Sequence, residues 1–413
     1  MKVKAYLLPL YAAATLLPQL LKLPAPFSEV QLTELLFALL LWGFRGDFLA
    51  TCNRFPLFTW SLAAYVAANL LSAITVGDTE TLLEGAARGY LGAVAILTIA
   101  HLQRYGWKPL ADWWRIATVG VATVVLGYYL LISVDYLSPN WGVVRYRSYP
   151  YLGDVLRLRA TASTSGMWVM LLLPGALFAL YRHKSSGGGG IPWAFVLIAT
   201  AMVPSWSKEL LLLGAGAVVL YWPSKLWSKV VASGLIVLLL VGTHYLVVGP
   251  QPPDAPGLQY RGQHTIAQLP GFHIVETVYT PLKHIALRVG AAHPLLGVGP
   301  GNFAVYSQVS ARAGELPPGF GPIDPHSTWT GAFAETGVLG LLTLLLLVGV
   351  IWRLGLRAVL GPVGVLLLLI LVASVFKDVA NFRGVWVLVG WWVANTPLST
   401  GFPPAAPPPY PSI

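Results

Sequence analysis

The chain has 413 residues, of which 56% are hydrophobic and 10% are charged, and its mean hydropathy is +0.68. Because charged residues make up about a quarter of a soluble globular protein, this composition excludes a soluble domain, a disordered chain, a collagen and a coiled coil. The apolar runs are long and unbroken, whereas barrel strands of the outer membrane alternate polar and apolar residues over roughly ten positions. The composition therefore predicts an all-α fold, that of a polytopic helical membrane protein.

The formal net charge of +10 has a simple explanation in such a protein. Lys and Arg gather in cytoplasmic loops and beside anionic lipid headgroups, so membrane lipids are expected partners and nucleic acid is not. Cys52 is the single cysteine, which excludes an internal disulfide and a cysteine-based zinc or iron–sulfur site. The histidines are scattered, and neither H-E-x-x-H nor D-x-D occurs, so no metal or cofactor is expected.

Twelve apolar runs approach the length of about twenty residues that a helix needs to cross a bilayer core. Gln19 and Lys22 stand where a cleavable signal would have small residues, so we interpret the first run as a span. The runs cover residues 5–21, 30–44, 56–76, 83–102, 116–136, 165–181, 191–206, 207–222, 230–248, 329–352, 358–376 and 384–396. They divide the chain into nine spans (1–248), one large loop (249–328), three spans (329–400) and a proline-rich cytoplasmic tail (401–413).

The distribution of Lys and Arg orients these spans. With the N-terminus inside, basic residues such as Arg104, Arg182 and Lys229 fall in cytoplasmic connections, as membrane insertion favours. Cations on the outer side break this rule, and either an anionic ligand or outer-leaflet lipid phosphate would account for them. They lie in the connection 137–164 (Arg145, Arg147, Arg157 and Arg159), between the seventh and eighth spans (Lys208), and in the large loop (Arg261, Lys283, Arg288 and Arg312).

The large loop is predicted to be partly helical, from His273 to Ala291, with a kink at Pro281. The next stretch, 293–303, reads H-P-L-L-G-V-G-P-G-N-F. Its three glycines in five positions permit tight turns and expose N–H groups, which suits either a surface turn or a cradle for phosphate. The spacing is neither that of a P-loop nor that of a dinucleotide-binding fold, so this stretch alone does not identify a ligand.

His326 directly precedes Ser327 and the apolar run 329–352, which contains Glu335. The dipole at a helix N-terminus lowers the pKa of an imidazole and keeps it neutral, and a neutral imidazole can act as a general base toward a hydroxyl. A capping or interfacial histidine without a catalytic role is the alternative. An acid inside a span costs about 3 kcal/mol, so we expect Glu335 to pair with a polar group of a neighbouring span or to orient the site.

Taken together, the large outer loop and these two motifs resemble the O-antigen ligase/polymerase family, which are bacterial membrane glycosyltransferases of the C-type fold. The family pattern is P-L-L-G-x-G-x-x-x-F, followed by H-[N/S]-x-x-L-x-x-x-x-E-x-G-x-x-G at the start of the next span. The resemblance is strong over residues 290–345 and elsewhere depends on hydropathy and segment order. The matching residues are Pro294 to Gly297, Phe303, His326, Ser327, Glu335, Gly337 and Gly340.

The resemblance implies an enzyme at the periplasmic face of the inner membrane. Such enzymes transfer a glycan from an undecaprenyl-diphosphate carrier to an acceptor hydroxyl, without a metal. The acceptor is a lipid A–core sugar for ligases and a carrier-linked glycan for polymerases, and the sequence leaves this choice open. In this family the histidine that corresponds to His326 activates the hydroxyl, and arginines bind the diphosphate.

The basic residues depart from the family pattern in two places. Ser207-Lys208 stands where the family has Ser-Arg, which keeps the charge but loses the bidentate fork of a guanidinium. The second arginine of the family has three candidate counterparts, Arg261, Lys283 and Arg288.

The resulting hypothesis is an inverting transfer with His326 as the base and Glu335 and Ser327 in support. The residues expected to bind the diphosphate are Lys208, Arg288, Arg157, Arg159 and Lys283. A transporter of lipid-linked glycans is the main alternative, and it predicts charges at mid-span or interrupted helices in matched halves. A structural subunit is a third alternative, and it predicts no special chemistry around the large loop.

Overall fold

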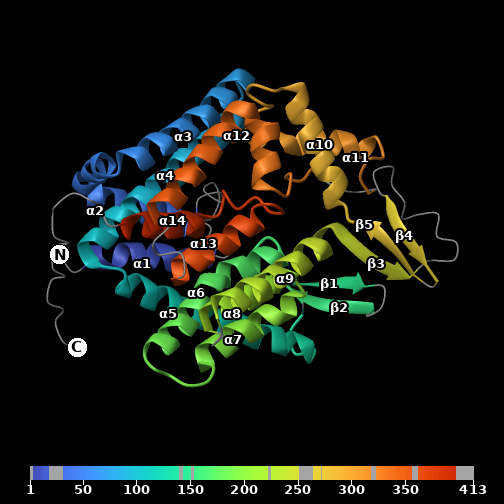
Figure 1. The fold of residues 1–413 in the computed structure, drawn as a ribbon, viewed down its shortest axis with the longest axis horizontal. Helices are drawn as coiled ribbons and strands as arrows, with labels where there is room; N and C mark the ends of the chain where they lie inside the picture. The colour runs from blue at the N-terminus through green and yellow to red at the C-terminus, as the bar shows by residue number, and fades with distance from the viewer. Residues whose placement is uncertain are drawn as a thin grey trace.

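The computed structural model describes most of the chain as a bundle of helices with a small mixed region at one end (Figure 1). Arg261 and the proline-rich tail, both named above, lie outside the described residues. The described residues are 3–17, 31–138, 143–149, 153–221, 225–250, 264–270, 272–317, 322–355 and 361–396.

The helices occur in the order that the apolar runs predict, and two further helices lie in the large loop. The helices before the loop are α1 (Lys4–Ala14), α2 (Leu32–Arg54), α3 (Pro56–Val76), α4 (Thr79–Tyr105), α5 (Lys108–Ser133), α6 (Ser165–Ser185), α7 (Trp193–Met202) with the 3₁₀ turn η1 (Val203–Ser205), α8 (Leu210–Tyr221) and α9 (Leu226–Tyr245). Those from the loop onward are α10 (Tyr279–Ala292), α11 (Phe303–Arg312), α12 (Thr328–Gly355), α13 (Pro362–Ala373) and α14 (Arg383–Ala394).

Every one of the twelve predicted apolar runs contains a helix. Among the described residues, seven helices are long and apolar enough to cross a membrane, namely α2 to α6, α9 and α12. The molecule is therefore a helical protein with several candidate membrane spans, as the composition predicts. The helices of the other five predicted runs, α1, α7, α8, α13 and α14, have fewer than eighteen residues each, so the number of twelve spans stays a prediction.

The ends of the helices follow from local sequence. Gly77 ends α3 in a left-handed conformation with a φ of 79°, which glycine adopts without strain. Asp78 then caps α4 by accepting the N–H of Thr81 at 2.7 Å. These adjacent caps turn the chain between two helices that pack against each other. As a result, the end of α3 and the start of α4 lie at the same end of the bundle as α10 and the start of α12 (Figure 1).

Two small antiparallel sheets were not predicted, so the description as all-α is incomplete. Strands β1 (Val144–Tyr149) and β2 (Gly153–Leu158) form a hairpin in the connection 137–164, and Arg145 is paired with Arg157 in its register. Strands β3 (Leu246–Pro250), β4 (Thr265–Leu269) and β5 (Phe272–Glu276) form a sheet in the order β3-β5-β4. These strands extend the large-loop region beyond the helices (Figure 1).

The predicted helix from His273 to Ala291 is wrong at its beginning. Residues up to Glu276 belong to β5, where Val275 and its neighbours pair with β3, and α10 begins only at Tyr279. The segment Phe272–Glu276 is short and carries the β-branched residues Ile274 and Val275, which favour a strand. The predicted kink at Pro281 is also wrong, because Pro281 lies in the first turn of α10, where no helical N–H is needed.

Helix α12 is interrupted at Gly337, where φ is 64° and ψ is −162°. These angles belong to a region that is essentially restricted to glycine. An α-helix joins each N–H to the carbonyl four residues before it. The break therefore leaves the carbonyls of Ala334 and Glu335, and the N–H groups of Val338 and Leu339, without their usual helical partners.

The glycine-rich stretch supplies these four missing partners. The N–H groups of Val298 and Gly299 donate to the two carbonyls, at 3.1 and 2.8 Å. The carbonyls of Pro294 and Leu295 accept from the two N–H groups, at 2.8 and 3.3 Å. We call this exchange between residues 294–299 and 334–339 the backbone joint. It fixes the position of the large loop against the first turns of α12.

The backbone joint leaves no room for larger residues at its glycines. A Cβ at Gly297 would lie 2.3 Å from the carbonyl carbon of Glu335, and one at Gly337 would lie 2.4 Å from that of Leu295. The hydroxyl of Ser72 in α3 also donates to the carbonyl of Glu335, at 2.8 Å. Helix α3 is therefore the third segment of the chain that contacts the joint. The stretch 293–303 therefore forms an internal contact, and the N–H groups of Val298 and Gly299 are not free to cradle a phosphate.

The substitution Gly337→Ala should destabilise the protein by about 2 kcal/mol or more, because alanine cannot adopt these angles without strain and its methyl group meets backbone. The matched control is Gly349→Ala on the same helix, where a Cβ would have no neighbour within 4 Å. We expect thermal unfolding in detergent to show a clearly lower Tm for the first variant and an unchanged or higher Tm for the second. Equal Tm values would contradict the role of the joint.

Candidate functional site

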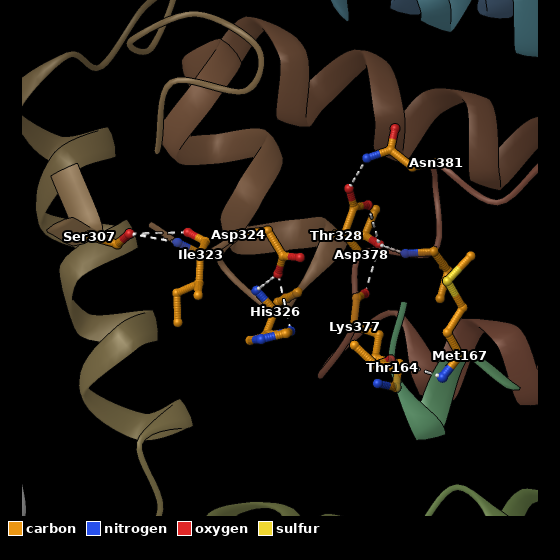
Figure 2. Close-up of polar contacts among 12 residues, drawn as sticks. Thr164, Met167, Ser307, Ile323, Asp324, His326, Thr328, Lys377, Asp378 and Asn381 are labelled. Carbon is orange, nitrogen blue, oxygen red and sulfur yellow. Dashed lines mark hydrogen bonds and ion pairs between the residues drawn. The ribbon is translucent and has the colours of Figure 1, made fainter. Parts of the chain in front are cut away.

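His326 lies two residues before α12 in an unusual backbone conformation, with a φ of 46°. Residues other than glycine rarely adopt positive φ, and such positions are held by their surroundings. The backbone N–H of His326 donates to Oδ1 of Asp324 at 2.7 Å, which closes a tight turn (Figure 2). Ser327 follows and contributes to the start of α12, since its hydroxyl accepts the N–H of Thr330 at 3.4 Å. Asp324 and α12 thus fix the backbone that carries the imidazole.

The same carboxylate also contacts the imidazole ring. Nδ1 of His326 lies 3.1 Å from Oδ1 of Asp324 (Figure 2). A carboxylate accepts hydrogen bonds and does not donate them, so this contact favours the tautomer with its proton on Nδ1. The lone pair of His326 then lies on Nε2, which is the atom that could accept a proton from a hydroxyl.

Burial of the ring lowers the pKa of His326 below its ordinary value. The positive charges of Lys377 and Lys208 act in the same direction, whereas the carboxylates of Asp324 and Glu209 oppose them. The sequence predicts this direction from the dipole of the helix, but the main cause in the structure is burial. The lowered pKa favours the uncharged imidazole, which is the form that can act as a base.

Tyr279, the first residue of α10, brings together residues from distant parts of the chain. The ring of His326 meets it edge-on, with centroids 5.1 Å apart. The ring of His244, near the end of α9, stacks on it with centroids 4.2 Å apart. The amine of Lys208 lies 4.8 Å from the centre of the Tyr279 ring. The structure thus places two predicted site residues, Lys208 and His326, around one aromatic ring.

Two further lysines lie close to this ring. Lys283, one turn along α10, donates to the carbonyl of Val375 at 2.7 Å. Lys377 forms an ion pair with Glu209 at 2.9 Å, and both side chains are largely buried. We call Lys208, Lys283 and Lys377 the lysine cluster, because the charges of all three act on His244. Burial lowers the pKa of Lys283 to about 8.

A cavity of about 190 Å³ lies beside the segment that carries His326. Asp324, Ser327 and Thr328 line this cavity, whereas His326 does not. Asp324 is therefore shared, because it lines the cavity and also contacts the imidazole. The rest of the wall includes four charged side chains, Glu84 and Arg88 from α4, Glu335 from α12 and Asp378 from the connection after α13.

Arg88 is the positive charge among these carboxylates. Its side chain is 6% exposed, and its Nε and Nη1 atoms have no hydrogen-bond partner among the described residues. Burial raises the pKa of Asp378, and the charge of Arg88 opposes that rise. Arg88 and Glu335 line the same cavity and attract each other. Glu335 therefore shares this cavity with an opposite charge from α4, and its expected pairing with a polar group of a neighbouring span stays a prediction.

Of the two predicted arginines at the end of the hairpin, Arg157 contacts the segment before Lys208. Arg157, in β2, donates from Nε to the carbonyl of Ser205 at 2.6 Å, and Ser205 precedes Lys208 by three residues. Arg159 follows directly after β2, and its side chain is partly buried. The hairpin thus brings one of the predicted cations of the connection 137–164, Arg157, to the segment that carries Lys208.

The structure places Arg288 away from this group. It lies five residues after Lys283 on α10, which turns its side chain to a different face of the helix. Its guanidinium is 61% exposed and forms an ion pair with Glu315 at 2.6 Å. The structure therefore does not bring Arg288 to His326, although the sequence analysis expected it in the diphosphate site.

Sequence reasoning missed several members of the site. Lys377 lies in a short connection that the topology places on the outer side, so an unexpected outer cation was an available signal. Asp324 lies two residues before the histidine, which is the spacing of a side chain that closes a tight turn. Arg88 is an arginine within a predicted span, and such residues are expensive and usually functional.

No protein-family model matches this chain, and no curated protein is similar to it at a significant level.

The substitution Arg88→Met should be strongly destabilising, by about 3–5 kcal/mol, because it leaves buried carboxylates without their compensating charge. Arg104→Met on the same helix is the matched control, since Arg104 is 45% exposed and its ion pair with Asp47 lies at the surface. We expect thermal unfolding in detergent to show a large loss of Tm only for the first variant. Similar Tm values for both variants would refute this role of Arg88.

Proposed function

We propose that the protein is a membrane glycosyltransferase of the O-antigen ligase/polymerase type. It transfers a glycan from an undecaprenyl-diphosphate carrier to an acceptor hydroxyl at the periplasmic face of the inner membrane. The observation that carries this proposal is the imidazole of His326, which contacts the same Tyr279 ring as Lys208 and lies beside the lysine cluster. A neutral imidazole can accept the proton of the acceptor hydroxyl, and the lysines can stabilise a leaving group that carries several negative charges.

In the proposed reaction, Nε2 of His326 accepts the proton of the acceptor hydroxyl. The oxygen attacks the anomeric carbon of the donor sugar, a new C–O bond forms, and the bond to the diphosphate breaks on the opposite face. The anomeric configuration is therefore inverted. Asp324 keeps the ring in the productive tautomer and stabilises the imidazolium that forms, because its carboxylate lies 3.1 Å from Nδ1.

The lysine cluster supports the proposal through the leaving group. Negative charge grows on the diphosphate as the bond to the sugar breaks, and fixed positive charges that face it lower the barrier. Lys208 and Lys283 contact aromatic rings, which hold the two amines near His244 and Tyr279. Arg157 approaches the same segment from the hairpin. We assign the diphosphate to this side of His326.

The acceptor defines two versions of this function. We favour the ligase version, in which the acceptor is a lipid A–core sugar, and the alternative is a polymerase that extends a carrier-linked glycan by the same chemistry. Purified protein supplied with a polyprenyl-diphosphate glycan and each acceptor in turn distinguishes the two versions by the product formed.

A transporter of lipid-linked glycans is the second candidate, and two observations favour it. Helix α12 is interrupted at Gly337, and Arg88 and Glu335 are charges within candidate spans. Both charged residues, however, lie within the first ten residues of helices that begin at the His326 end of the bundle, which suits chemistry on one side better than passage through the membrane. In sealed proteoliposomes, movement of the donor without transfer would establish the transporter.

The substitution His326→Ala should lower glycan transfer by about 10²–10⁴-fold, because it removes the general base, and should leave folding intact. The matched control is His284→Ala on α10, whose side chain is exposed. Transfer is measured with purified protein and a polyprenyl-diphosphate glycan, and folding is checked by the Tm. Transfer at the wild-type rate by His326→Ala would remove this residue from the mechanism.

The substitution Lys208→Ala should reduce transfer by about 10²–10³-fold if this amine stabilises charge on the diphosphate. Lys208→Arg keeps the positive charge and should retain much more activity. The two variants are compared under saturating donor, with the Tm of each recorded. Equal activity of Lys208→Ala and Lys208→Arg would show that positive charge is not what the site requires.

Binding of the donor should weaken as the pH rises through about 8, because the lowered pKa of Lys283 makes its amine lose its charge there rather than near its ordinary value. Lys283→Arg stays charged and should bind with little change between pH 7 and about 9.5. Calorimetric titration with a polyprenyl diphosphate measures both. The same pH dependence in both proteins would exclude Lys283 from the diphosphate site.

A further inference from the structure

A second cavity, of about 490 Å³, lies at the end of the bundle opposite His326. Helix α13 begins in this cavity and ends at Ala373, next to the segment whose carbonyls bind Lys283 and Thr328. Helix α14 runs the other way, from Arg383 near the first cavity to Ala394 beside the second. The second cavity therefore opens on the face for which the distribution of Lys and Arg predicts a cytoplasmic location.

Basic side chains line this second cavity. Lys108 and Arg115 come from α5, and Arg182 comes from the last turn of α6. Asp112, on the same face of α5, forms an ion pair with Arg182. No ion pair within the described part of the chain compensates Lys108 or Arg115, and Nε of Arg115 is buried without a hydrogen-bond partner there. The cavity thus carries a surplus of positive charge.

The N-terminus of α13 faces the same space. Gly361, Pro362, Val363 and Gly364 all line the cavity. This helix end has no side-chain cap and no acidic residue in its first turn. The N–H groups of Val363 and Gly364 point out of the helix end, where the helix dipole also favours an anion. The N–H groups at the start of α13 and the basic side chains of α5 therefore both direct positive charge into the second cavity.

Aromatic rings form another part of the wall. Trp391 of α14 is buried and stacks on Phe178 of α6, with centroids 5.0 Å apart. Trp107, at the start of α5, lies 6.2 Å from Trp391 and is 45% exposed. Aromatic rings contribute little to the binding of a small soluble anion, whereas the glycerol and acyl portions of a lipid would pack against them.

We propose that this cavity binds the phosphate group of an anionic phospholipid. The phosphate lies between Lys108, Arg115 and the start of α13, and the apolar part of the lipid lies against Trp107 and Trp391. Basic pockets between helices on the cytoplasmic side are typical sites for anionic headgroups. Ordinary cytoplasmic loop bias explains basic residues at helix ends, but it does not require them to converge with an uncapped helix N-terminus on one aromatic cavity.

The test is the stabilisation of the full-length, delipidated protein in a non-ionic detergent. Phosphatidylglycerol should raise the Tm by several degrees with saturation, because a ligand that binds only the folded state stabilises it, and phosphatidylcholine should not. The double variant Lys108→Gln/Arg115→Gln should need at least tenfold more phosphatidylglycerol for the same shift. The control variant Arg45→Gln/Arg54→Gln loses the same charge from exposed residues of α2 outside the cavity, and it should respond like the wild type.

Several outcomes would overturn the proposal. These are an equal response to phosphatidylcholine, an unchanged response of the double variant, or an equal loss in both double variants. Full protection by inorganic phosphate alone would also overturn it, since the ligand would then be a soluble anion. If Lys108→Gln/Arg115→Gln does not fold, each single variant is titrated by native mass spectrometry, and retention of bound phosphatidylglycerol at the wild-type level in both would equally reject the site.

Discussion

The backbone joint between residues 294–299 and 334–339 determines how the site is assembled. A break in α12 exposes two carbonyls and two N–H groups, and a turn from the large loop provides a partner for each of them. Unpaired backbone groups away from water are costly, so the break and the turn are stable only together. Because α10 ends directly before this turn and His326 directly precedes α12, the exchange also sets Tyr279 against His326. The residues of the backbone joint therefore hold the imidazole of His326 beside the lysine cluster, although they have no part in the proposed chemistry.

The charged groups differ on the two sides of the segment 322–328. The lysine cluster lies with His326 and Tyr279, and its one carboxylate, Glu209, is paired with Lys377. The cavity beside the segment carries four carboxylates and one arginine among its lining residues. Asp324 belongs to both sides, since it contacts the imidazole and lines the cavity. In the proposed reaction this division directs a polyanionic donor to one side. It also separates the carboxylates, which would repel a diphosphate, from the place where the diphosphate leaves.

Hydropathy predicted where the helices lie, because an apolar run of about twenty residues has few other stable forms in a membrane protein. It did not predict the sheets, since short strands such as β5 carry a weak signal and β3 pairs with it across a long loop. The motif residues His326, Lys208 and Glu335 were found because their residue types are unusual at their positions. Tyr279, Lys377 and Arg88 join the site only through tertiary contacts, which periodicity does not report. Arg288 was predicted to bind the diphosphate because it lies in the large loop. In the structure it lies on another face of α10 and pairs with Glu315.

The interruption of α12 also changes how much of that helix a lipid bilayer has to accommodate. At about 1.5 Å per residue, the whole of Thr328–Gly355 would measure about 42 Å, which exceeds a hydrocarbon layer of about 30 Å. Residues 338–355 alone measure about 27 Å and match that layer closely. The portion before Gly337 can then lie at headgroup depth, where Glu335 lines the cavity beside the segment 322–328. Glu335 there avoids much of the penalty for an ionisable group among acyl chains, so one glycine shortens the span and makes an acid tolerable in a stretch that hydropathy assigns to the membrane.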